Sequence, residues 1–348
     1  MRHPREVLLG AQAALAPLPV CDHYSGVEAR MRKSLALQAE MSQEFGACVF
    51  DVTLDCEDGA PVGGEKNHAN MVAALVNQAH ATGRNEASGL APRVAVRVHP
   101  VDHPAFEQDL DIIVGGAAAA LCHVMIPKVE TLADVNRAAH LMDQIAAKSG
   151  RTDPLPLHVL IESPASVHRA FEIAAHPRVQ SLSFGLMDFV SAHGGAIPAG
   201  AMATHTGQDS DELDQFSHPL VVRAKLEISS ACHAYGKVPA HCVVTEFSDT
   251  GVVKAAATRA ARTLGYTRMW SIHPAQIRPI LEAFAPQAHE IELAANIMVA
   301  AEQADWAPIS FRGKLHDRAS YRYFWQVLER AHQTGRRLPD EVQVYFSA

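Results

Sequence analysis

The sequence lacks most of the short motifs that assign a chemistry directly. It contains no Gly-x-Gly-x-x-Gly and no P-loop, which weakens an open nucleotide-binding sheet. Its 20 histidines include no His-Glu-x-x-His, so a zinc site is not the first interpretation. The six cysteines form no Cys-x-x-Cys pair and several lie in apolar runs, so we expect reduced core residues and a cytoplasmic protein.

Long apolar runs are also missing. None reaches the roughly 18 residues of a membrane helix, and residues 1–6 are basic without the apolar core or cleavage site of a signal peptide. The formal net charge of -8 argues against nucleic-acid binding, although a local basic patch or a metal would still hold an anionic substrate. We therefore expect small-molecule partners, with no nucleic acid and no membrane.

What the sequence does contain is a regular alternation of apolar and amphipathic segments. Strands are predicted at 17–24, 47–56, 93–98, 119–126, 157–161, 179–184, 239–244 and 268–272, with helices at 27–44, 66–81, 104–115, 131–149, 166–176, 219–234, 250–264 and 274–284. Such alternation indicates a parallel sheet, and eight repeats favour closure into a (β/α)8 TIM barrel. A chain of 348 residues is normal for such a barrel with an extension.

The predicted organisation has two parts. Residues 1–285 form the barrel with a short leading helix near 2–14, and residues 286–348 form a C-terminal helical arm with helices at 287–304 and 321–332. The arm packs either on its own barrel or on a neighbouring subunit. The stretch 191–217 is predicted to be a long loop, either a lid or substrate loop or a disordered insertion.

Two predicted strands that are joined by one crossover helix both finish near a carboxylate, Glu162 and Asp188. The carboxyl ends of parallel strands lie at one face, so these carboxylates are expected to approach each other and to need a cation or a proton between them. Two carboxylates with several waters suit Mg²⁺. The alternative is that one of them caps the following helix or pairs with Lys128.

The other strand ends supply further candidates for the same face. Arg97 follows an alternating apolar run, and its guanidinium matches a substrate carboxylate in bidentate fashion. Glu57 and Asp58 are candidates to accept hydrogen bonds from metal-bound water. They are equally compatible with a capped loop or an ion pair to Arg97. Lys128 is expected to pair with Glu130 or Glu162 rather than to act as a Schiff-base lysine.

Six strand-end motifs occur in an order and spacing that resemble one family. They are Leu-Asp-Cys-Glu-Asp-Gly-Ala-Pro (54–61), Val-Arg-Val-His-Pro (96–100), Ile-Pro-Lys-Val-Glu (126–130), Leu-Ile-Glu-Ser (160–163), Phe-Gly-Leu-Met-Asp (184–188) and Ser-Ile-His-Pro-Ala-Gln-Ile (271–277). Together they resemble the HpcH/HpaI aldolase/citrate lyase family, in its citrate lyase β-subunit-like and malyl-CoA lyase branch. Phe-Arg-Gly-Lys-Leu-His-Asp (311–317) resembles the C-terminal arm of that branch.

The resemblance implies a Mg²⁺ cofactor, a homotrimer or a dimer of trimers, and specific roles. Glu162 and Asp188 would ligate the metal, Arg97 would hold the substrate carboxylate, and Glu57 and Asp58 would order metal-bound water. The arm would cross to a neighbouring subunit, where Asp317 would act as a catalytic proton acceptor and donor. A helix N-cap is the other interpretation of Asp317.

The resulting prediction is a Mg²⁺-dependent carbon–carbon lyase, for aldol- or Claisen-type cleavage or condensation. Its substrate would be a small 2-oxo or hydroxy acid, either free or as its CoA thioester. The first strand reads Val-Cys-Asp-His-Tyr-Ser-Gly (20–26) where the branch usually has Leu-Phe-Val-Pro-Gly, so CoA recognition stays open. The alternatives are an acyl-CoA thioesterase that uses the same metal site to activate water, and a barrel subunit without catalysis.

Overall fold

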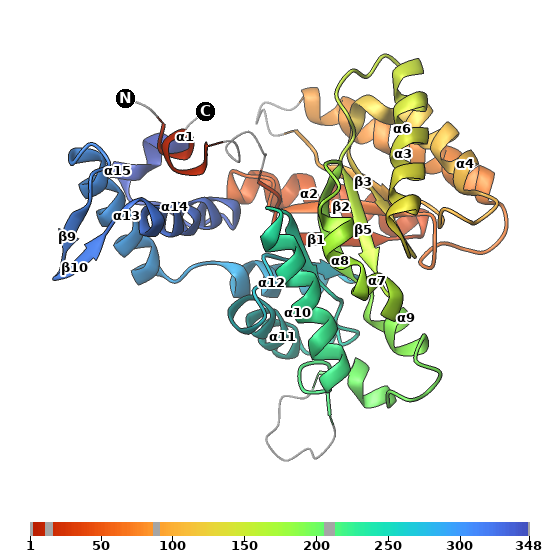
Figure 1. Ribbon diagram of the computed structural model, residues 1–348. Coiled ribbons are helices and arrows are strands. Elements are labelled where there is room, and N and C mark those ends of the chain that lie inside the picture. The colour runs from red at the N-terminus through yellow and green to blue at the C-terminus, as the bar shows by residue number, and fades with distance from the viewer. Residues whose placement is uncertain (1–2, 11–16, 86–90, 205–212, 347–348) are drawn as a thin grey trace.

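Eight parallel strands close into a barrel at the centre of the molecule (Figure 1). The structure is a computed structural model that describes residues 3–10, 17–85, 91–204 and 213–346. Each strand pairs with the next in the sequence, and β8 pairs with β1 to complete the ring. The strands are β1 Cys21–Ser25, β2 Phe50–Asp55, β3 Val94–Arg97, β4 Leu121–Ile126, β5 Leu157–Ile161, β6 Val179–Phe184, β7 Val238–His241 and β8 Arg268–Ser271. The predicted (β/α)8 barrel is confirmed.

Helices surround the barrel, so the strands are buried on both faces and their outward side chains form the main apolar core. The helical elements around the barrel are α2 Glu28–Phe45, α3 Glu65–Asn85, α4 Phe106–Asp109, η2 Leu110–Val114, α5 Gly115–Ala117, η3 Ala118–Ala120, α6 Leu132–Lys148, α7 Pro164–His168, α8 Ala170–Ala174, α9 Leu186–Ser191, η4 Ala199–Met202, α10 Pro219–Ala234, α11 Thr250–Thr263, η5 Pro274–Gln276 and α12 Ile277–Phe284. Most follow the predicted pattern.

The connection between β5 and β6 differs from its prediction as one helix. It starts earlier, at Pro164, because Ser163 forms a capping box with Ser166 and proline suits the first helical position. It then breaks at Arg169, whose φ of -100° and ψ of 9° leave the α-helical region, so α7 and α8 are separate short helices. The early start places the first turn of α7 directly against the end of β5.

The C-terminal segment builds a second core beside the barrel. It contains α13 Ala288–Gln303, the hairpin β9 Ile309–Phe311 and β10 Lys314–His316, α14 Arg318–Gln333, α15 Asp340–Gln343 and η6 Val344–Phe346. The leading helix α1 Pro4–Leu9 also lies here (Figure 1), and its Leu8 packs in the same core as Tyr321 and Trp325. Position in the chain groups the leading helix with the barrel; in the structure its buried Leu8 packs against the arm.

Inside the barrel, the inward-facing side chains form a polar layer below an apolar one. The polar layer contains Asp22 and Arg268, both fully buried. Above it, toward the carboxyl ends of the strands, Tyr24 and Trp270 pack in one apolar cluster with Leu160. This arrangement follows from the two-residue period of a strand, which puts Asp22 and Tyr24 on the same side of β1.

Candidate active site

Glu162 directly follows the last residue of β5 and is 5% exposed. The backbone N–H of Lys128 donates to its carboxylate, and Lys128 adopts a left-handed φ of 50° at this position. The backbone N–H of Glu162 in turn donates to Ser166 Oγ at 3.2 Å. Burial and the neighbouring Asp188 carboxylate raise the pKa of Glu162 to about 8, against the opposing effect of the Lys128 N–H.

Asp188 lies near Glu162, but it comes from a helix and not from the end of a strand, where the sequence analysis places it. The strand β6 ends at Phe184, and Asp188 is half-buried in the first turn of the short helix α9. Gly185 permits the close approach, because a Cβ there would lie 2.4 Å from Glu162 Oε2. The predicted pairing of Glu162 with Asp188 is therefore present in the structure, across the neighbouring strands β5 and β6.

These two side chains fit a hard divalent cation. Both offer carboxylate oxygens, which Mg²⁺ prefers, and the negative charge of Asp188 already works against ionisation of Glu162. A cation between them would remove that repulsion. The pair also lies at the carboxyl-terminal end of the barrel, where barrel enzymes hold their active sites.

Arg97, the last residue of β3, is not a free cation. Its Nε donates to Asp55 Oδ1 at 2.7 Å and its Nη2 to Asp55 Oδ2 at 2.5 Å, while Nη1 lies 3.2 Å from Glu57 Oε2. The predicted ion pair with Glu57 is present, but the main partner is Asp55, which the sequence reasoning missed. Asp51, Thr53 and Asp55 alternate along β2, and this period of polar residues was the available signal.

Glu57 and Asp58 are not equivalent. Glu57 is buried and accepts from Lys128 Nζ at 2.5 Å, whereas the side chain of Asp58 is 57% exposed and lies 3.4 Å from the same ammonium. Burial raises the pKa of Glu57, and Arg97 and Lys128 oppose that rise. We expected the Lys128 side chain to pair with Glu130 or Glu162. It reaches Glu57 instead, and only its backbone touches Glu162.

Asp317 lies between β10 and α14, in the arm. Its carboxylate accepts from the backbone N–H groups of Ala319 and Ser320 at 3.0 and 3.3 Å, so it is the N-cap of α14. The helix-cap interpretation is confirmed. The side chain is exposed, and these two hydrogen bonds stay within the arm.

A cavity of about 740 Å³ opens beside Arg97, between the ends of β1, β2, β3 and β8. Arg97 and Asp55 form one side, and Tyr24 and Trp270 face them from β1 and β8. Arg30 and Lys33 line the same cavity from α2, together with several further residues that include Phe247, Ile272 and His273. Sequence reasoning did not assign Tyr24 or Trp270, because aromatic residues inside a strand are more often core.

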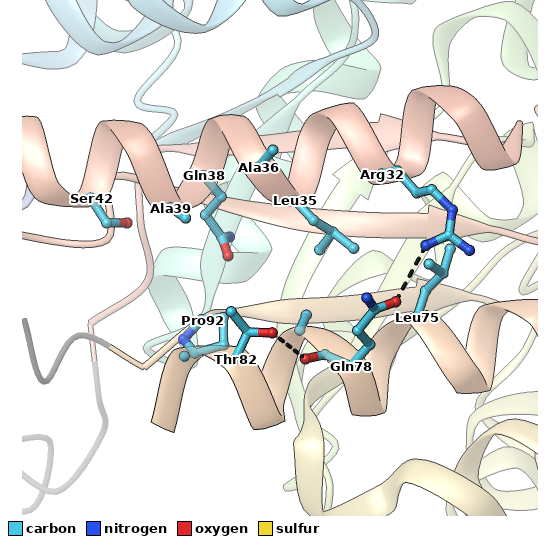
Figure 2. Close-up of a pocket in the computed structure, with 12 residues that line it drawn as sticks. Arg32, Leu35, Ala36, Gln38, Ala39, Ser42, Leu75, Gln78, Thr82 and Pro92 are labelled. Carbon is cyan, nitrogen blue, oxygen red and sulfur yellow. Dashed lines mark hydrogen bonds between the residues drawn. The ribbon is translucent and has the colours of Figure 1, made fainter. Parts of the chain in front are cut away.

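A second hollow lies on the outside of the barrel, between α2 and α3, with a volume of about 290 Å³. Figure 2 shows Arg32 donating to Gln78 across it, at 3.3 Å, and Thr82 donating to the backbone of Gln78. None of its 12 lining residues is acidic, and it lies on the flank of the barrel rather than at the ends of the strands. We therefore do not assign the chemistry to it.

Asp22, His123 and His158 also lie close enough together to suggest a cation site inside the barrel. Two observations argue against it. Arg268 Nη2 already lies 2.7 Å from Asp22 Oδ2. The two imidazole rings stack with centroids 3.5 Å apart and 14° between their planes, so their in-plane lone pairs do not converge. We interpret this cluster as part of an internal ion network.

A closed (β/α)8 barrel with acidic side chains gathered at the carboxyl ends of its strands has the architecture of a barrel enzyme. The comparisons with known proteins define the family. Residues 34–274 match the family model "HpcH/HpaI aldolase/citrate lyase", and the chain belongs to this family of carbon–carbon lyases.

Individual relatives agree with the family assignment. The L-malyl-CoA/beta-methylmalyl-CoA lyase of Cereibacter sphaeroides is 31% identical over 302 residues, which cover 83% of this chain and 90% of that protein. A crystal structure of a citrate lyase from Burkholderia xenovorans is 46% identical with a TM-score of 0.78 and covers 99% of both chains. The protein CitE of Mycobacterium tuberculosis, crystallised with magnesium, acetoacetate and coenzyme A, is similar in fold, with 20% identity, a TM-score of 0.62, and 91% of this chain and 99% of that chain covered.

Within the described residues, no helix is both long and apolar enough to cross a membrane.

Proposed function

We propose that the protein is a Mg²⁺-dependent carbon–carbon lyase acting on a small hydroxy acid or 2-oxo acid as its CoA thioester. The observation that carries the proposal is the Glu162–Asp188 pair, in which burial and the charge of Asp188 together raise the pKa of Glu162 to about 8. The relative from Cereibacter is named for malyl-CoA and beta-methylmalyl-CoA cleavage, and the M. tuberculosis structure contains magnesium and coenzyme A. These names support the substrate class.

Glu162 and Asp188 would hold the metal ion. When bound, Mg²⁺ supplies a Lewis acid for the carbonyl and carboxylate oxygens of a 2-oxo acid. Glu57 would accept a hydrogen bond from a water in that site, and Lys128 holds Glu57 in place at 2.5 Å. Asp58 would have a weaker role, since its carboxylate is exposed.

Arg97 would orient the substrate carboxylate with the donors that remain to it. A guanidinium has five N–H donors, and the contacts with Asp55 and Glu57 use three, which leaves two. Because Asp55 largely balances the charge of Arg97, we expect Arg97 to orient the substrate through its hydrogen bonds more than to attract it by charge. Asp55 fixes the plane of the guanidinium and thereby the direction in which the two remaining donors point.

The cavity beside Arg97 would take the thioester arm. Arg30 and Lys33 line it without an ion-pair partner in the part of the chain that the structure describes, and two cations at a cavity mouth favour an anionic chain such as that of CoA. The acidic residues of the loop near 209–214 would disfavour an anionic chain if they lay near the cavity. Asp209, Asp211 and Glu212 lie outside the described residues, and Asp214 is buried against Arg259 on the flank of the barrel, 3.1 Å away.

We also propose that the arm completes the site of a neighbouring subunit in a homotrimer or a dimer of trimers, with Asp317 as the proton acceptor and donor there. Its support is that Asp317 is exposed in a single chain, next to the exposed side chain of Leu315. A cytoplasmic location stays part of the proposal. It is supported by the free cysteines Cys21, Cys48, Cys56, Cys122, Cys232 and Cys242.

The test is a product analysis with malyl-CoA, beta-methylmalyl-CoA and citramalyl-CoA in the presence and absence of Mg²⁺. An acyl-CoA together with a 2-oxo acid, formed only with Mg²⁺, would support the lyase. Free CoA together with the intact hydroxy acid would instead identify a thioesterase. Mg²⁺ binding without either product would identify a barrel that has lost catalysis.

A variant tests the proton acceptor in the same assay. Asp317→Asn keeps an N-cap side chain that accepts hydrogen bonds, so α14 should stay intact. We expect it to lose turnover while it retains Mg²⁺ binding. A fully active Asp317→Asn protein would show that another group moves the proton.

A further inference from the structure

Two aromatic residues form a floor beside Arg97. Tyr24 of β1 and Trp270 of β8 are 6% and 8% exposed and both line the cavity. Their rings stack with centroids 4.4 Å apart and 25° between the planes. The guanidinium carbon of Arg97 lies 5.6 Å from the centre of the Tyr24 ring, close enough for a cation–π contact.

The polar atoms of this floor have no protein partner. The Tyr24 hydroxyl and the Trp270 Nε1–H are buried and make no hydrogen bond in the described residues. Other buried tyrosines are satisfied: Tyr266 donates to the carbonyl of Lys225 at 3.0 Å and Tyr321 to that of Ala307 at 2.7 Å. A buried polar group without a partner is unfavourable in the free protein, so two of them on one cavity floor indicate a partner that arrives with a ligand.

The chemistry of these groups selects the partner. An indole N–H only donates, a tyrosine hydroxyl can donate, and Arg97 only donates. An oxygen that carries negative charge can accept from all three groups, and we take such an oxygen as their ligand. The carboxylates of the proposed metal site follow β5 and lie in α9, whereas this floor comes from β1 and β8, so the oxygen belongs to a different part of the substrate from the part that the metal would hold.

We propose that Tyr24 and Trp270 donate hydrogen bonds to the acyl oxygen of the thioester, and so act as an oxyanion site for the lyase. This rests on the proposed function. In cleavage, a base takes the proton of the substrate hydroxyl, and the O–H electron pair becomes the carbonyl of the released 2-oxo acid. The electrons of the broken carbon–carbon bond pass to the acyl fragment, whose enolate charge resides on the acyl oxygen. Protonation of its α-carbon completes the reaction.

The two donors stabilise the acyl oxygen most strongly once negative charge has developed on it. Preorganised donors aimed at such an oxygen in a water-poor site stabilise the transition state more than the ground state. Loss of a donor should therefore lower turnover and leave the half-saturating thioester concentration nearly unchanged.

The experiment follows deuterium exchange at the α-carbon of acetyl-CoA and propionyl-CoA in D₂O, with the full-length protein and Mg²⁺, by NMR. This isolates enolate formation from carbon–carbon cleavage. Tyr24→Phe and Trp270→Phe keep the aromatic stack and remove one donor each. We expect exchange to fall by about 10² in each variant, without a lower melting temperature, because each change removes an unpaired buried group.

Tyr266→Phe is the matched control. It removes a buried hydroxyl that has a partner, away from the cavity, so it should lower the melting temperature and leave the exchange rate unchanged. Exchange at the wild-type rate in either Tyr24→Phe or Trp270→Phe would overturn the oxyanion site. A wild-type protein that neither exchanges these protons nor cleaves the thioester panel would overturn the proposed function, and this inference with it.

Discussion

The barrel contains two groups of buried charges, and they are balanced in different ways. In the interior, Arg268 Nη2 lies 2.7 Å from both Asp22 and Asp51, and Arg93 Nε lies 2.5 Å from Asp51. Two aspartates and two arginines thus neutralise each other within the fold. At the carboxyl ends of the strands the balance is different.

The mouth of the barrel has an excess of negative charge. Its carboxylates are Asp55, Glu57, Asp58, Glu162 and Asp188. Its cations are Arg97 and Lys128, with Arg30 and Lys33 at the edge of the cavity. Five carboxylates against four cations leave a formal excess of one, and burial together with the charge of Asp188 raises the pKa of Glu162. The interior pairs neutralise each other, whereas Glu162 and Asp188 form no ion pair in the described part of the chain, so we expect a cation to complete the mouth.

Breaking the interior network should have the largest effect on stability. Arg268→Met leaves Asp22 and Asp51 buried with one cationic partner fewer, which costs about 3–5 kcal/mol in the free energy of unfolding. Urea denaturation measures this. Arg262→Met is the control, because it breaks the exposed pair with Glu290 and should cost less than about 1 kcal/mol. Equal losses in the two variants would contradict the distinction between buried and exposed pairs.

At the mouth, loss of one carboxylate of the proposed metal site should spare stability and remove function. We expect Glu162→Gln to lower turnover of the thioester substrate by at least about 10², with an unchanged or raised melting temperature in the absence of metal. Steady-state kinetics checks the first result and calorimetry the second. Glu130→Gln is the control on the same face, since Glu130 is exposed and accepts from Ser163 Oγ. A fully active Glu162→Gln protein would remove Glu162 from the site.

Asp55 shares a property with each group of charges. It is buried and paired, like the interior aspartates, but it lies at the mouth of the barrel. Asp55→Asn removes the charge that fixes the Arg97 guanidinium, and we expect the half-saturating substrate concentration to rise by about tenfold. Asp58→Asn, at an exposed carboxylate, should change it little. If the two substitutions have the same effect on substrate titrations, the buried pair has no special role.

The smallest expected effect is on the arm. Asp317→Ala removes the cap of α14 and should cost about 1 kcal/mol in the free energy of unfolding. Asp317→Asn should be near wild type in stability, because asparagine also caps helices. Thermal unfolding of the two variants separates the structural role of Asp317 from its proposed catalytic one, and a stability loss in Asp317→Asn equal to that in Asp317→Ala would show that the cap requires charge.

The fold could be predicted because it rests on periodicity, which a sequence displays. The β-strands recur as apolar runs and the amphipathic helices follow them, so the eight repeats were visible without coordinates. The break at Arg169 was not, because it depends on a local backbone conformation that no residue type specifies. The placement of α1 on the arm was also hidden, since it depends on contacts between the two ends of the chain.

The sequence predicted the site residues that directly follow a strand. It did not predict which partners the long side chains contact. Glu162 follows β5 directly, so the topology brought it to Asp188. The register between β2, β3 and β4 determines which carboxylates Arg97 and Lys128 can reach. The sequence contained several acidic candidates for each cation and did not show this register. Tyr24 and Trp270 were missed because only the structure shows that their polar atoms are unpaired.

The central claim is that the mouth of the barrel is incomplete without a cation, and the pH dependence of Mg²⁺ binding tests it most directly. Glu162 in the metal-free protein has a pKa of about 8, above the ordinary 4.5, so it stabilises the metal-free fold at low pH and this contribution is lost as the pH rises through about 8. A bound cation must displace that proton. Calorimetric titration of the wild-type protein should therefore show an apparent Mg²⁺ affinity that rises by about tenfold per pH unit up to pH 8 and then levels off. An affinity that stays constant between pH 6 and about pH 8 would contradict the account.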